Sequence, residues 1–442
     1  MRFWYNILFT IFFLFSSPYY FFKMRRRGNW KAGFKQRFWH YDNKVKQSLT
    51  NRHVLWMHAV SVGEINVCLQ LVRALQPRMP NLKIMVSTTT TTGMAELQRR
   101  LPPSVGKIYY PIDRRTCVVR ALAAVHPNVI VLVESEIWPN FIRRARSLGK
   151  PIFLVNARLS DRSYPRYKKF GFIFRELFAA FTAVGAQNEA DAAKLRELGC
   201  AAKAVHVVGN MKFDAARQAE GKSLDVGALL AQLGVAPDAP LLVAGSTHAG
   251  EEGILAEQFL RLRARFPTLV LVLVPRHFER AREVGRELSE HGIKYVYRSE
   301  ITPDTRRAAG SLQCLLVNTT GELRYFYEQA TVAFVGKSLT AKGGQNPIEP
   351  AALGKPVVFG PNMQNFTDVT RIFLAQDGAV QVRDAEELEE TLGELLADPA
   401  RREILGRNAQ RIVQENQGAV ERTAELIIDR LQDQDFYFAP KK

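Results

Sequence analysis

Short runs in which every residue is apolar recur through most of this chain and alternate with longer amphipathic runs. The runs at 129–133 (VIVLV) and 269–274 (LVLVLV) are the clearest examples. A strand that is apolar on both faces lies between two layers of helices, which is the environment of a parallel sheet. We therefore predict strands at 54–60, 83–89, 129–134, 151–156, 183–187, 205–208, 241–245, 269–274, 295–298, 315–317, 331–335 and 356–359.

The alternation is interrupted once, in a polar stretch with weak periodicity at 214–238, and then begins again. We predict an α/β fold of two doubly wound, Rossmann-like domains at 28–218 and 219–442. The last predicted helix places Val420, Ala424, Ile427 and Leu431 on one face, and it either ends the second domain or returns to the first. Open α/β sheets bind ligands beyond the carboxyl ends of their strands, so two facing domains predict a shared cleft.

An apolar stretch at 3–22 contains no acidic or basic side chain apart from tyrosine, and about 20 apolar residues can cross a bilayer. Half of the net charge of +18 lies within residues 1–50, and Arg25, Arg26 and Arg27 follow the stretch directly. We predict a retained membrane anchor at 1–27 that either spans the bilayer or lies in the plane of its headgroups. A cleavable signal peptide is disfavoured because no small-x-small site precedes the arginines.

The charge and the cysteines both indicate the compartment. Cations that flank an anchor stay cytoplasmic, so we expect both domains in the cytoplasm. The cysteines are widely separated and lie in apolar surroundings typical of reduced core thiols: Cys68, Cys117, Cys200 and Cys314. A nucleic-acid-binding protein usually spreads its basic residues over the folded body, whereas residues 51–442 carry only half of the charge. No nucleic-acid partner is expected.

Glu64 follows the first predicted strand, in the sequence His58-Ala-Val-Ser-Val-Gly-Glu64. Ser61 and Glu64 have the spacing of a capping box, in which the serine caps a helix and the glutamate bonds back to it. A glutamate at a helix start beside a cleft also suits a general base, because the helix dipole favours its ionised form. The residues alone leave both roles open.

Further polar groups follow later strands of the first domain. Glu134 and Glu136 end the run at 129–133 and can point the same way, either into a site or into solvent at the sheet edge. Arg158 and Lys212 each come just past a strand, where a cation either neutralises a phosphate or lies at the surface. The threonine run at 88–92 favours helix capping over ligand contact.

The second domain carries a candidate phosphate site in the sequence Lys342-Gly-Gly-Gln-Asn-Pro-Ile-Glu349. We predict that Asn346 caps a helix beginning at Pro347 and that the N–H groups of Gly343 and Gly344 can face an anion. Glu349 suits paired ribose hydroxyls or a capping box with Asn346. Loops at 245–248, 275–277 and 320–322 lie on the same predicted edge, so we expect a nucleotide here.

Six motifs in one order resemble those of the 3-deoxy-D-manno-octulosonate (Kdo) transferases of lipopolysaccharide synthesis. They are His58-Ala-Val-Ser-Val-Gly-Glu64, Glu134-Ser-Glu-Ile-Trp-Pro-Asn140, Asn156-Ala-Arg-Leu-Ser160, Gly209-Asn-Met-Lys-Phe-Asp214, Val274-Pro-Arg-His277 and Gly343-Gly-Gln-Asn-Pro-Ile-Glu349. The resemblance covers residues 20–430. It implies a GT-B glycosyltransferase at the cytoplasmic face of the bacterial inner membrane, which transfers Kdo from CMP-Kdo to a phosphorylated lipid A precursor. Inversion at the anomeric carbon, and no bound metal or other cofactor, are also implied.

The resemblance also implies roles at individual positions. Glu64 corresponds to the general base, and Glu134 and Lys212 to groups that stabilise the transition state. The implied CMP contacts are Pro275, Arg276, Thr320, Gly321, Glu322, Asn346, Pro347, Ile348 and Glu349. Gln345 departs from the family pattern, in which a histidine is often found. The alternatives are another nucleotide-sugar transferase or a GT-B sugar-nucleotide epimerase, which would have no use for the apolar N-terminal stretch.

Overall fold

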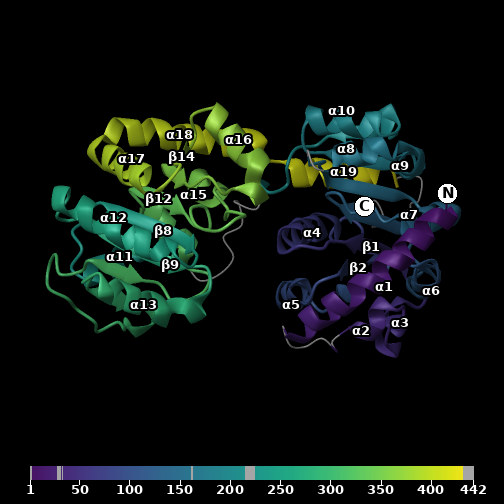
Figure 1. Ribbon diagram of the computed structural model, residues 1–442, viewed down its shortest axis with the longest axis horizontal. Coiled ribbons are helices and arrows are strands. Elements are labelled where there is room, and N and C mark those ends of the chain that lie inside the picture. Colours follow the sequence, from purple (N-terminus) through teal and green to yellow (C-terminus); the bar gives the residue numbers. More distant parts are fainter. Residues whose placement is uncertain (1, 27–30, 32, 161–162, 215–223, 432–442) are drawn as a thin grey trace, which may run out of the picture. The chain divides into compact units, whose positions relative to one another are not determined.

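Two compact units make up the chain (Figure 1). The computed structural model describes residues 2–26, 31, 33–160, 163–214 and 224–431. Unit 1 comprises Met1–Ala215 and Gln417–Lys442, and unit 2 comprises Ala216–Asn416. The predicted boundaries at 27 and 218, and the cation Arg27, lie outside the described residues.

A seven-stranded sheet forms the centre of unit 1, in the order β3-β2-β1-β4-β5-β6-β7, and all of its pairings are parallel. Its strands are β1 (His53–His58), β2 (Leu82–Thr88), β3 (Gly106–Tyr109), β4 (Val129–Val133), β5 (Ile152–Ala157), β6 (Ala183–Ala186) and β7 (Val205–Val207). All five residues of β4 are buried, as a strand covered on both faces requires.

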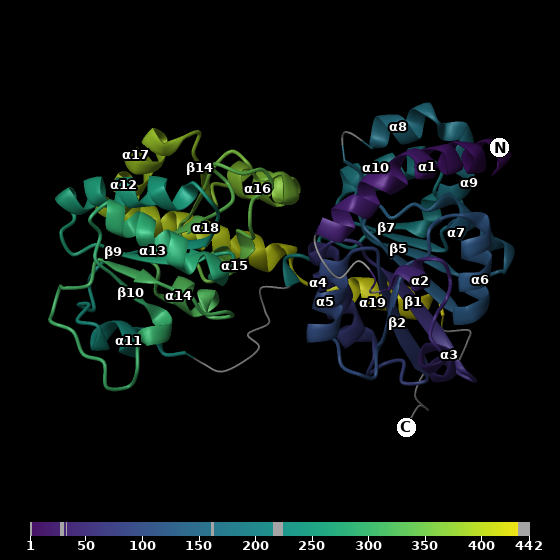
Figure 2. The ribbon, with the colours of Figure 1, turned by 60° about the horizontal axis from the view of Figure 1, so that its bottom comes forward.

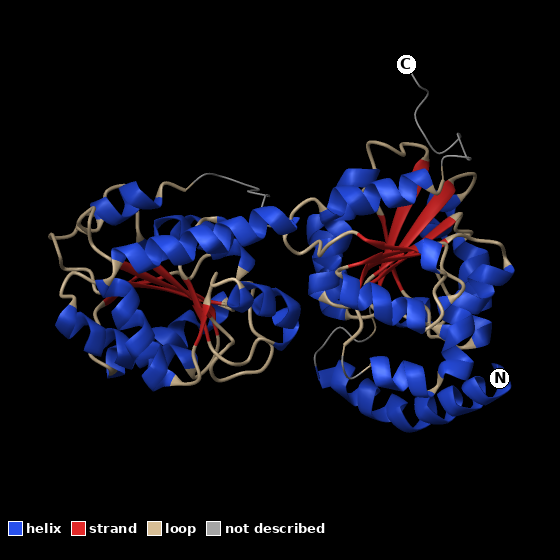
Figure 3. Ribbon diagram, turned by 90° about the horizontal axis from the view of Figure 1, so that it is seen from above, coloured by secondary structure: helices blue, strands red, loops and turns tan. Residues whose placement is uncertain are grey.

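Helices cover both faces of this sheet (Figure 3). One core contains residues of α4 (Val62–Leu75), α5 (Thr91–Arg100) and α19 (Ala419–Asp429). The other contains residues of α3 (Asn43–Leu49), α6 (Arg115–Val125), α7 (Pro139–Ser147), α9 (Gly171–Phe178) and α10 (Glu189–Glu197). The described part of the unit also contains α1 (Arg2–Arg26), the short helices α2 (Phe34–Arg37) and α8 (Tyr164–Lys169), and the 3-10 turn η1 (Ala202–Ala204).

The last helix, α19, packs among elements of unit 1 (Figure 2). Ala424, Ile427 and Leu431 are buried in the same core as the apolar face of α4. Asp214 fixes the start of the helix, because its carboxylate accepts the N–H groups of Gly418 at 2.6 Å and Val420 at 2.8 Å. The return of the last helix to the first domain is therefore the arrangement found.

Unit 2 repeats the plan with a second seven-stranded parallel sheet, in the order β10-β11-β9-β8-β12-β13-β14. Its strands are β8 (Leu241–Thr247), β9 (Val270–Pro275), β10 (Tyr295–Tyr297), β11 (Cys314–Leu316), β12 (Val332–Val335), β13 (Val357–Phe359) and β14 (Val380–Gln381). Its helices are α11 (Val226–Gln232), α12 (Glu251–Arg265), α13 (Ala281–Glu290), α14 (Leu323–Gln329), α15 (Ile348–Ala352), α16 (Thr367–Ala375), α17 (Ala385–Ala397) and α18 (Pro399–Asn416), with 3-10 turns η3 (Phe278–Arg280), η4 (Arg298–Glu300) and η5 (Gln364–Phe366).

The apolar N-terminal stretch forms helix α1 (Arg2–Arg26), which lies along unit 1 in Figure 1. Two polar contacts hold its first turns: the Tyr5 hydroxyl donates to Asp113 Oδ2 at 2.8 Å, and Asn140 Nδ2 donates to Asn6 Oδ1 at 2.9 Å. Among the described residues, no helix has both the length and the apolar character needed to cross a bilayer.

The prediction of two parallel α/β halves is confirmed, and the four cysteines are buried and free, as expected. Two edge strands, β3 and β14, were not predicted. The helix expected to begin at Pro347 begins at Ile348, with Pro347 in the N-cap position, a difference of one residue at a helix end.

Candidate functional site

Glu64 lies in the first turn of α4, directly beyond the carboxyl end of β1. Ser61 caps the helix by accepting the Glu64 N–H at 3.2 Å, and its hydroxyl donates to Glu64 Oε1 at 2.8 Å. The N–H of Val60 donates to the second carboxylate oxygen at 2.8 Å. Ser61 and Glu64 therefore bond to each other at the helix start, with the Val60 N–H in place of the Ser61 N–H of a regular capping box, and these bonds fix the orientation of the carboxylate.

Electrostatics set Glu64 apart from an ordinary cap. Its side chain is only 8% exposed, and burial raises its pKa to about 7, with further raising by the charges of Glu134 and Glu136. The hydrogen bonds from Val60 and Ser61 act in the opposite direction. A carboxylate with a pKa near 7 takes up and releases protons at neutral pH, so the residue can be both a cap and a general base.

Glu134 directly follows β4, and its carboxylate lies near two cationic side chains. Lys212 Nζ lies 3.5 Å from Glu134 Oε1, and Arg158 Nε lies 4.0 Å from Glu134 Oε2. Glu134 has a left-handed backbone with φ 57°, a conformation that non-glycine residues rarely adopt, and its N–H donates to the carbonyl of Val155. The turn thus places the carboxylate between residues that follow β5 and β7.

The loop that bears Lys212 is held by buried asparagines. Asn156, at the end of β5, is fully buried with φ 51°, and its Oδ1 accepts the N–H of Met211 at 3.0 Å. Asn210 Oδ1 accepts the N–H of Lys212 at 3.0 Å. The motifs that begin at residues 156 and 209 therefore meet, and they fix the backbone from which Lys212 reaches Glu134.

A second carboxylate, Glu136, contacts His58 and Trp138. These residues belong to the motifs of the sequence analysis, but their contact was not predicted. Glu136 Oε2 accepts the indole N–H of Trp138 at 2.7 Å and lies 3.6 Å from His58 Nε2. His58 is buried, stacks on Tyr110 at 3.6 Å between ring centroids, and contacts Ser87 through Nδ1 at 3.1 Å. The feature of the sequence that could have pointed to this group is His58, a histidine at the end of an apolar predicted strand.

The threonine run lies beside Glu64 and acts chiefly as a cap. Thr90 Oγ1 accepts the N–H of Gly93 at 3.0 Å at the start of α5, so the predicted cap is confirmed. The hydroxyls of Thr88 and Thr90 also donate to the carbonyl of Val60, whose N–H holds the Glu64 carboxylate. The loop therefore supports the backbone behind Glu64.

In unit 2, the predicted nucleotide residues follow neighbouring strands. Arg276 comes directly after β9, is exposed, and donates its N–H to the Thr247 carbonyl at the end of β8. Asn346 accepts the N–H of Ile348 at 3.1 Å and donates to Glu349 Oε1 at 3.3 Å. Burial raises the pKa of Glu349, and the hydrogen bond from Asn346 and the charges of Arg324 and Arg276 lower it. Asn346 thus contacts both Ile348 and Glu349 at the start of α15.

The loop after β11 is ordered around Glu322. Its carboxylate lies 3.0 Å from Arg298 Nε and accepts the Thr319 hydroxyl at 2.6 Å. Gly321 has φ 85° and open space around its Cα, so the turn with Thr320 is accessible to a ligand. Pro275 ends β9, the strand next to β11.

The glycine pair does not offer free N–H groups. Gly343 N–H donates to Gln364 Oε1 at 2.7 Å, and Gly344 N–H donates to the Lys337 carbonyl at 2.9 Å. The prediction that these groups face an anion is therefore wrong for this structure. The glycines are needed because φ is 125° and 71°, and because Asn365 and Met363 leave no room for a Cβ.

Glu251 was missed by the sequence analysis, although it starts a helix just past the 245–248 loop. The side chain is fully buried and accepts four backbone N–H groups, from His248, Lys337, Ser338 and Leu339, at 2.6 to 2.9 Å. The one feature of the sequence that could have pointed to Glu251 is an acidic residue at the start of a predicted helix. Its role is to hold the 337–339 segment against the end of β8.

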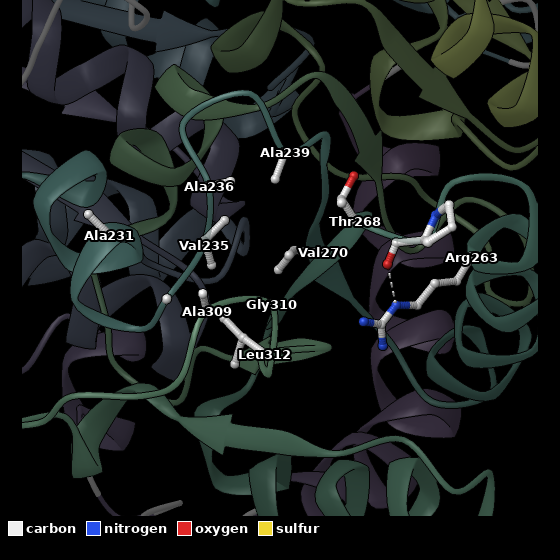
Figure 4. Close-up of a pocket in the computed structure, with 12 residues that line it drawn as sticks. Ala231, Val235, Ala236, Ala239, Arg263, Thr268, Val270, Ala309, Gly310 and Leu312 are labelled. Atoms are coloured by element: carbon white, nitrogen blue, oxygen red, sulfur yellow. Dashed lines mark hydrogen bonds between the residues drawn. The ribbon is translucent and has the colours of Figure 1, made fainter.

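A cavity of about 330 Å³ in unit 2 lies away from these loops (Figure 4). Its lining includes Ala239, Thr268 and Leu312, which precede β8, β9 and β11. Arg263 borders it and donates to the Pro267 carbonyl at 3.1 Å. The cavity is therefore at the amino ends of the strands, whereas parallel sheets bind ligands at the carboxyl ends.

The predicted residues thus fall into two groups, each within one unit. Glu64, Glu134 and Lys212 lie at the carboxyl edge of the first sheet. The nine predicted CMP contacts lie at the carboxyl edge of the second: Pro275, Arg276, Thr320, Gly321, Glu322, Asn346, Pro347, Ile348 and Glu349.

Comparisons with known proteins identify the family. The sequence model described as "3-Deoxy-D-manno-octulosonic-acid transferase (kdotransferase)" matches residues 32–215. The 3-deoxy-D-manno-octulosonic acid transferase of Bordetella pertussis is 34% identical, over 92% of this chain and 94% of its own. The Haemophilus influenzae enzyme of the same name is 32% identical, over 84% and 86%.

A crystal structure of a putative UDP-N-acetylglucosamine 2-epimerase from Listeria monocytogenes superposes with a TM-score of 0.58, covering 88% of this chain and 100% of that one. At 13% identity, this likeness concerns the fold alone. The similarity to the two transferases runs through both units, and the chain therefore belongs to the 3-deoxy-D-manno-octulosonic acid transferases, a family of glycosyltransferases.

Proposed function

We propose that this chain transfers Kdo from CMP-Kdo to a phosphorylated lipid A precursor, with inversion and with Glu64 as the general base. The observation that carries the proposal is the Glu64 carboxylate, oriented by two hydrogen-bond donors and with its pKa raised to about 7. Glu64 takes the proton from the acceptor hydroxyl as that oxygen attacks the anomeric carbon. The bond from this carbon to the CMP phosphate breaks in the same step.

Neighbouring charged residues stabilise the charges that develop on the sugar and on the departing phosphate. Lys212 and Glu134 stabilise the charge that develops at the sugar, and Arg276 neutralises the departing phosphate. Asn346 and Glu349 hold the nucleotide, as does the turn that contains Thr320, Gly321 and Glu322. The reaction needs no metal or other cofactor, because protein cations supply the positive charge.

The decisive experiment replaces Glu64 by glutamine. The amide keeps the shape of the side chain and an oxygen that can accept the Val60 N–H, but it cannot take up a proton at neutral pH. We expect Glu64→Gln to bind CMP normally and to yield no transfer product by mass spectrometry. Glu96→Gln on α5 of the same unit is the matched control. Near-normal transfer by Glu64→Gln would leave Glu64 as a cap only.

We also propose that the enzyme works at the inner membrane, with both units on the cytoplasmic side and α1 at the lipid surface. One face of α1 is apolar and exposed, with side chains between 61% and 83% exposed at Leu8, Phe12, Phe15, Tyr19 and Phe22. Their spacing keeps them on one side of the helix, and aromatic side chains favour the headgroup region.

Substitution on the exposed face tests this placement without disturbing the contacts of Tyr5 and Asn6. We expect Phe12→Gln/Phe15→Gln to reduce binding to lipid vesicles and to spare turnover of an acceptor dissolved in detergent. Unchanged vesicle binding by this variant would refute the placement of α1.

A further inference from the structure

A cationic cavity of about 500 Å³ lies in unit 1 between α1, α6 and α7. None of the residues that line it is acidic, and four of them are arginines. Its lining includes Asn6, Thr10, Arg114, Arg115, Arg143 and Arg144.

The arginine charges in this cavity are only partly balanced. Within the described part of the chain, Arg114 and Arg115 are exposed and form no ion pair. Arg143 is buried, and its Nη1 has no hydrogen-bond partner, although its Nε lies 3.7 Å from Glu176. Asp113, the nearest carboxylate along the chain, accepts the Tyr5 hydroxyl and two N–H groups of α7, and its charge also acts on Arg143, so it balances part of the arginine charge. The cavity therefore favours an anion.

The inner face of α1 connects this cavity to an apolar one. Asn6, Thr10, Phe13 and Ser17 follow each other at helical spacing on a single face; the first two line the cationic cavity, and the last two line the other. Thr10 and Phe13 are about 5 Å apart along the helix axis, at a rise of 1.5 Å per residue.

The apolar cavity has a volume of about 770 Å³. Its lining includes Phe13, Phe21, Phe34 and Phe38, from α1 and from the segment 34–38, together with Thr90 and Thr91 of the loop behind Glu64. Arg37 also lines it, and its guanidinium donates to the Thr89 carbonyl. A cavity of this size and character can hold an acyl chain, because burying each CH₂ contributes about 0.8 kcal/mol.

We propose that the two cavities together bind one molecule of a membrane phospholipid, with its phosphate at the arginines and an acyl chain beside Phe13 and Phe21. This site rests on and extends the proposed membrane placement, and we propose it as distinct from the site of the acceptor. A free phosphate ion would use only the cationic cavity, whereas a single face of α1 lines both. The bound lipid fixes how unit 1 lies on the bilayer.

Binding of soluble and membrane lipids to the full chain tests the proposal. The probes are dihexanoyl phosphatidylglycerol below its micelle concentration, inorganic phosphate, and vesicles of phosphatidylglycerol or phosphatidylcholine. The test variant is Arg114→Gln/Arg115→Gln, and Arg99→Gln/Lys203→Gln is the control, because it removes the same charge from exposed positions elsewhere on unit 1. Equal thermal unfolding of the variants establishes that both are folded.

We expect the short-chain lipid to bind at least about tenfold more tightly than inorganic phosphate, because only the lipid fills the apolar cavity. Affinity for phosphatidylglycerol vesicles should fall about 30-fold in the test variant and much less in the control. Transfer to a detergent-dissolved acceptor should keep its KM.

Three results would overturn the proposal. Equal affinity for phosphatidylglycerol and inorganic phosphate would indicate a site for a free anion. Equal losses in the two double variants would reduce the effect to overall charge. A raised KM for the acceptor in detergent would assign the cavity to the acceptor. The binding measurements need no donor, so a failure of the proposed transfer reaction would be seen separately.

Discussion

With Glu64 as the proposed general base, its raised pKa should make the reaction rate depend on pH in a range where an ordinary glutamate would not. Glu64 is 8% exposed as a residue, and its pKa rises from 4.5 to about 7, mainly through burial and then through the charges of Glu134 and Glu136. A general base works only when it is ionised. With a pKa of about 7, about one tenth of the enzyme has ionised Glu64 at pH 6, one half at pH 7 and nine tenths at pH 8.

We therefore expect kcat/KM to rise about tenfold between pH 6 and pH 8, whereas a base at the ordinary value of 4.5 would give an almost flat profile. Initial rates with CMP-Kdo and a detergent-dissolved acceptor, at fixed ionic strength, provide the profile. Glu136→Gln removes one of the like charges, so it should move the midpoint to lower pH. Glu96→Gln, on α5, should leave the midpoint in place.

The same shift has a consequence for stability. Because the folded state holds the Glu64 proton more tightly than the unfolded chain, this contribution is present below pH 4.5 and is lost as the pH rises through 7. Relative to Glu64→Gln, the wild type should lose about 3 kcal/mol of unfolding free energy between pH 4 and pH 8. A flat rate profile between pH 6 and pH 8, with equal stability changes in the two proteins, would refute the raised pKa.

Three further outcomes can be measured on the same protein. Lys212→Met leaves Glu134 with Arg158 at 4.0 Å as its remaining cation, so transfer should fall about 100-fold while CMP binding, followed by calorimetry, is retained. Asp214→Ala removes the acceptor of two N–H groups at the start of α19; urea unfolding should show a loss of about 1–3 kcal/mol, and Asp214→Asn a smaller one. Treatment with EDTA should leave the rate of transfer unchanged, and strict metal dependence would contradict the proposed mechanism.

The sequence predicted the strands that lie inside the two described sheets and the edge strands β7 and β10, and it missed the edge strands β3 and β14. Strands such as β4 are apolar at every position because helices cover both faces, so the pattern is visible without a structure. β3 has only two buried residues, and β14 is two residues long and has none. Their extended conformation depends on pairing with β2 and β13, and this pairing cannot be predicted from their own residues.

The candidate site likewise contains features that the sequence predicts and features that only the fold creates. The loops with Glu64, Glu134, Lys212 and Arg276 were predicted because carboxyl ends of parallel strands meet at one edge. The internal use of the Gly343 N–H by Gln364 could not be predicted, because the two residues are 21 positions apart and meet through the fold. The four hydrogen bonds to Glu251 could not be predicted for the same reason, because three of their donors lie more than 80 residues away in the sequence.

The position of α19 in unit 1 has a consequence for synthesis on the ribosome. The core that supports Glu64 contains Ala424, Ile427 and Leu431, which are translated more than 200 residues after the end of the unit's first segment. At about 5–20 residues per second, that part of the core stays open for roughly 10 to 40 s. Unit 2 is continuous in sequence and can finish folding first, so the half that carries the proposed base is the later one to mature.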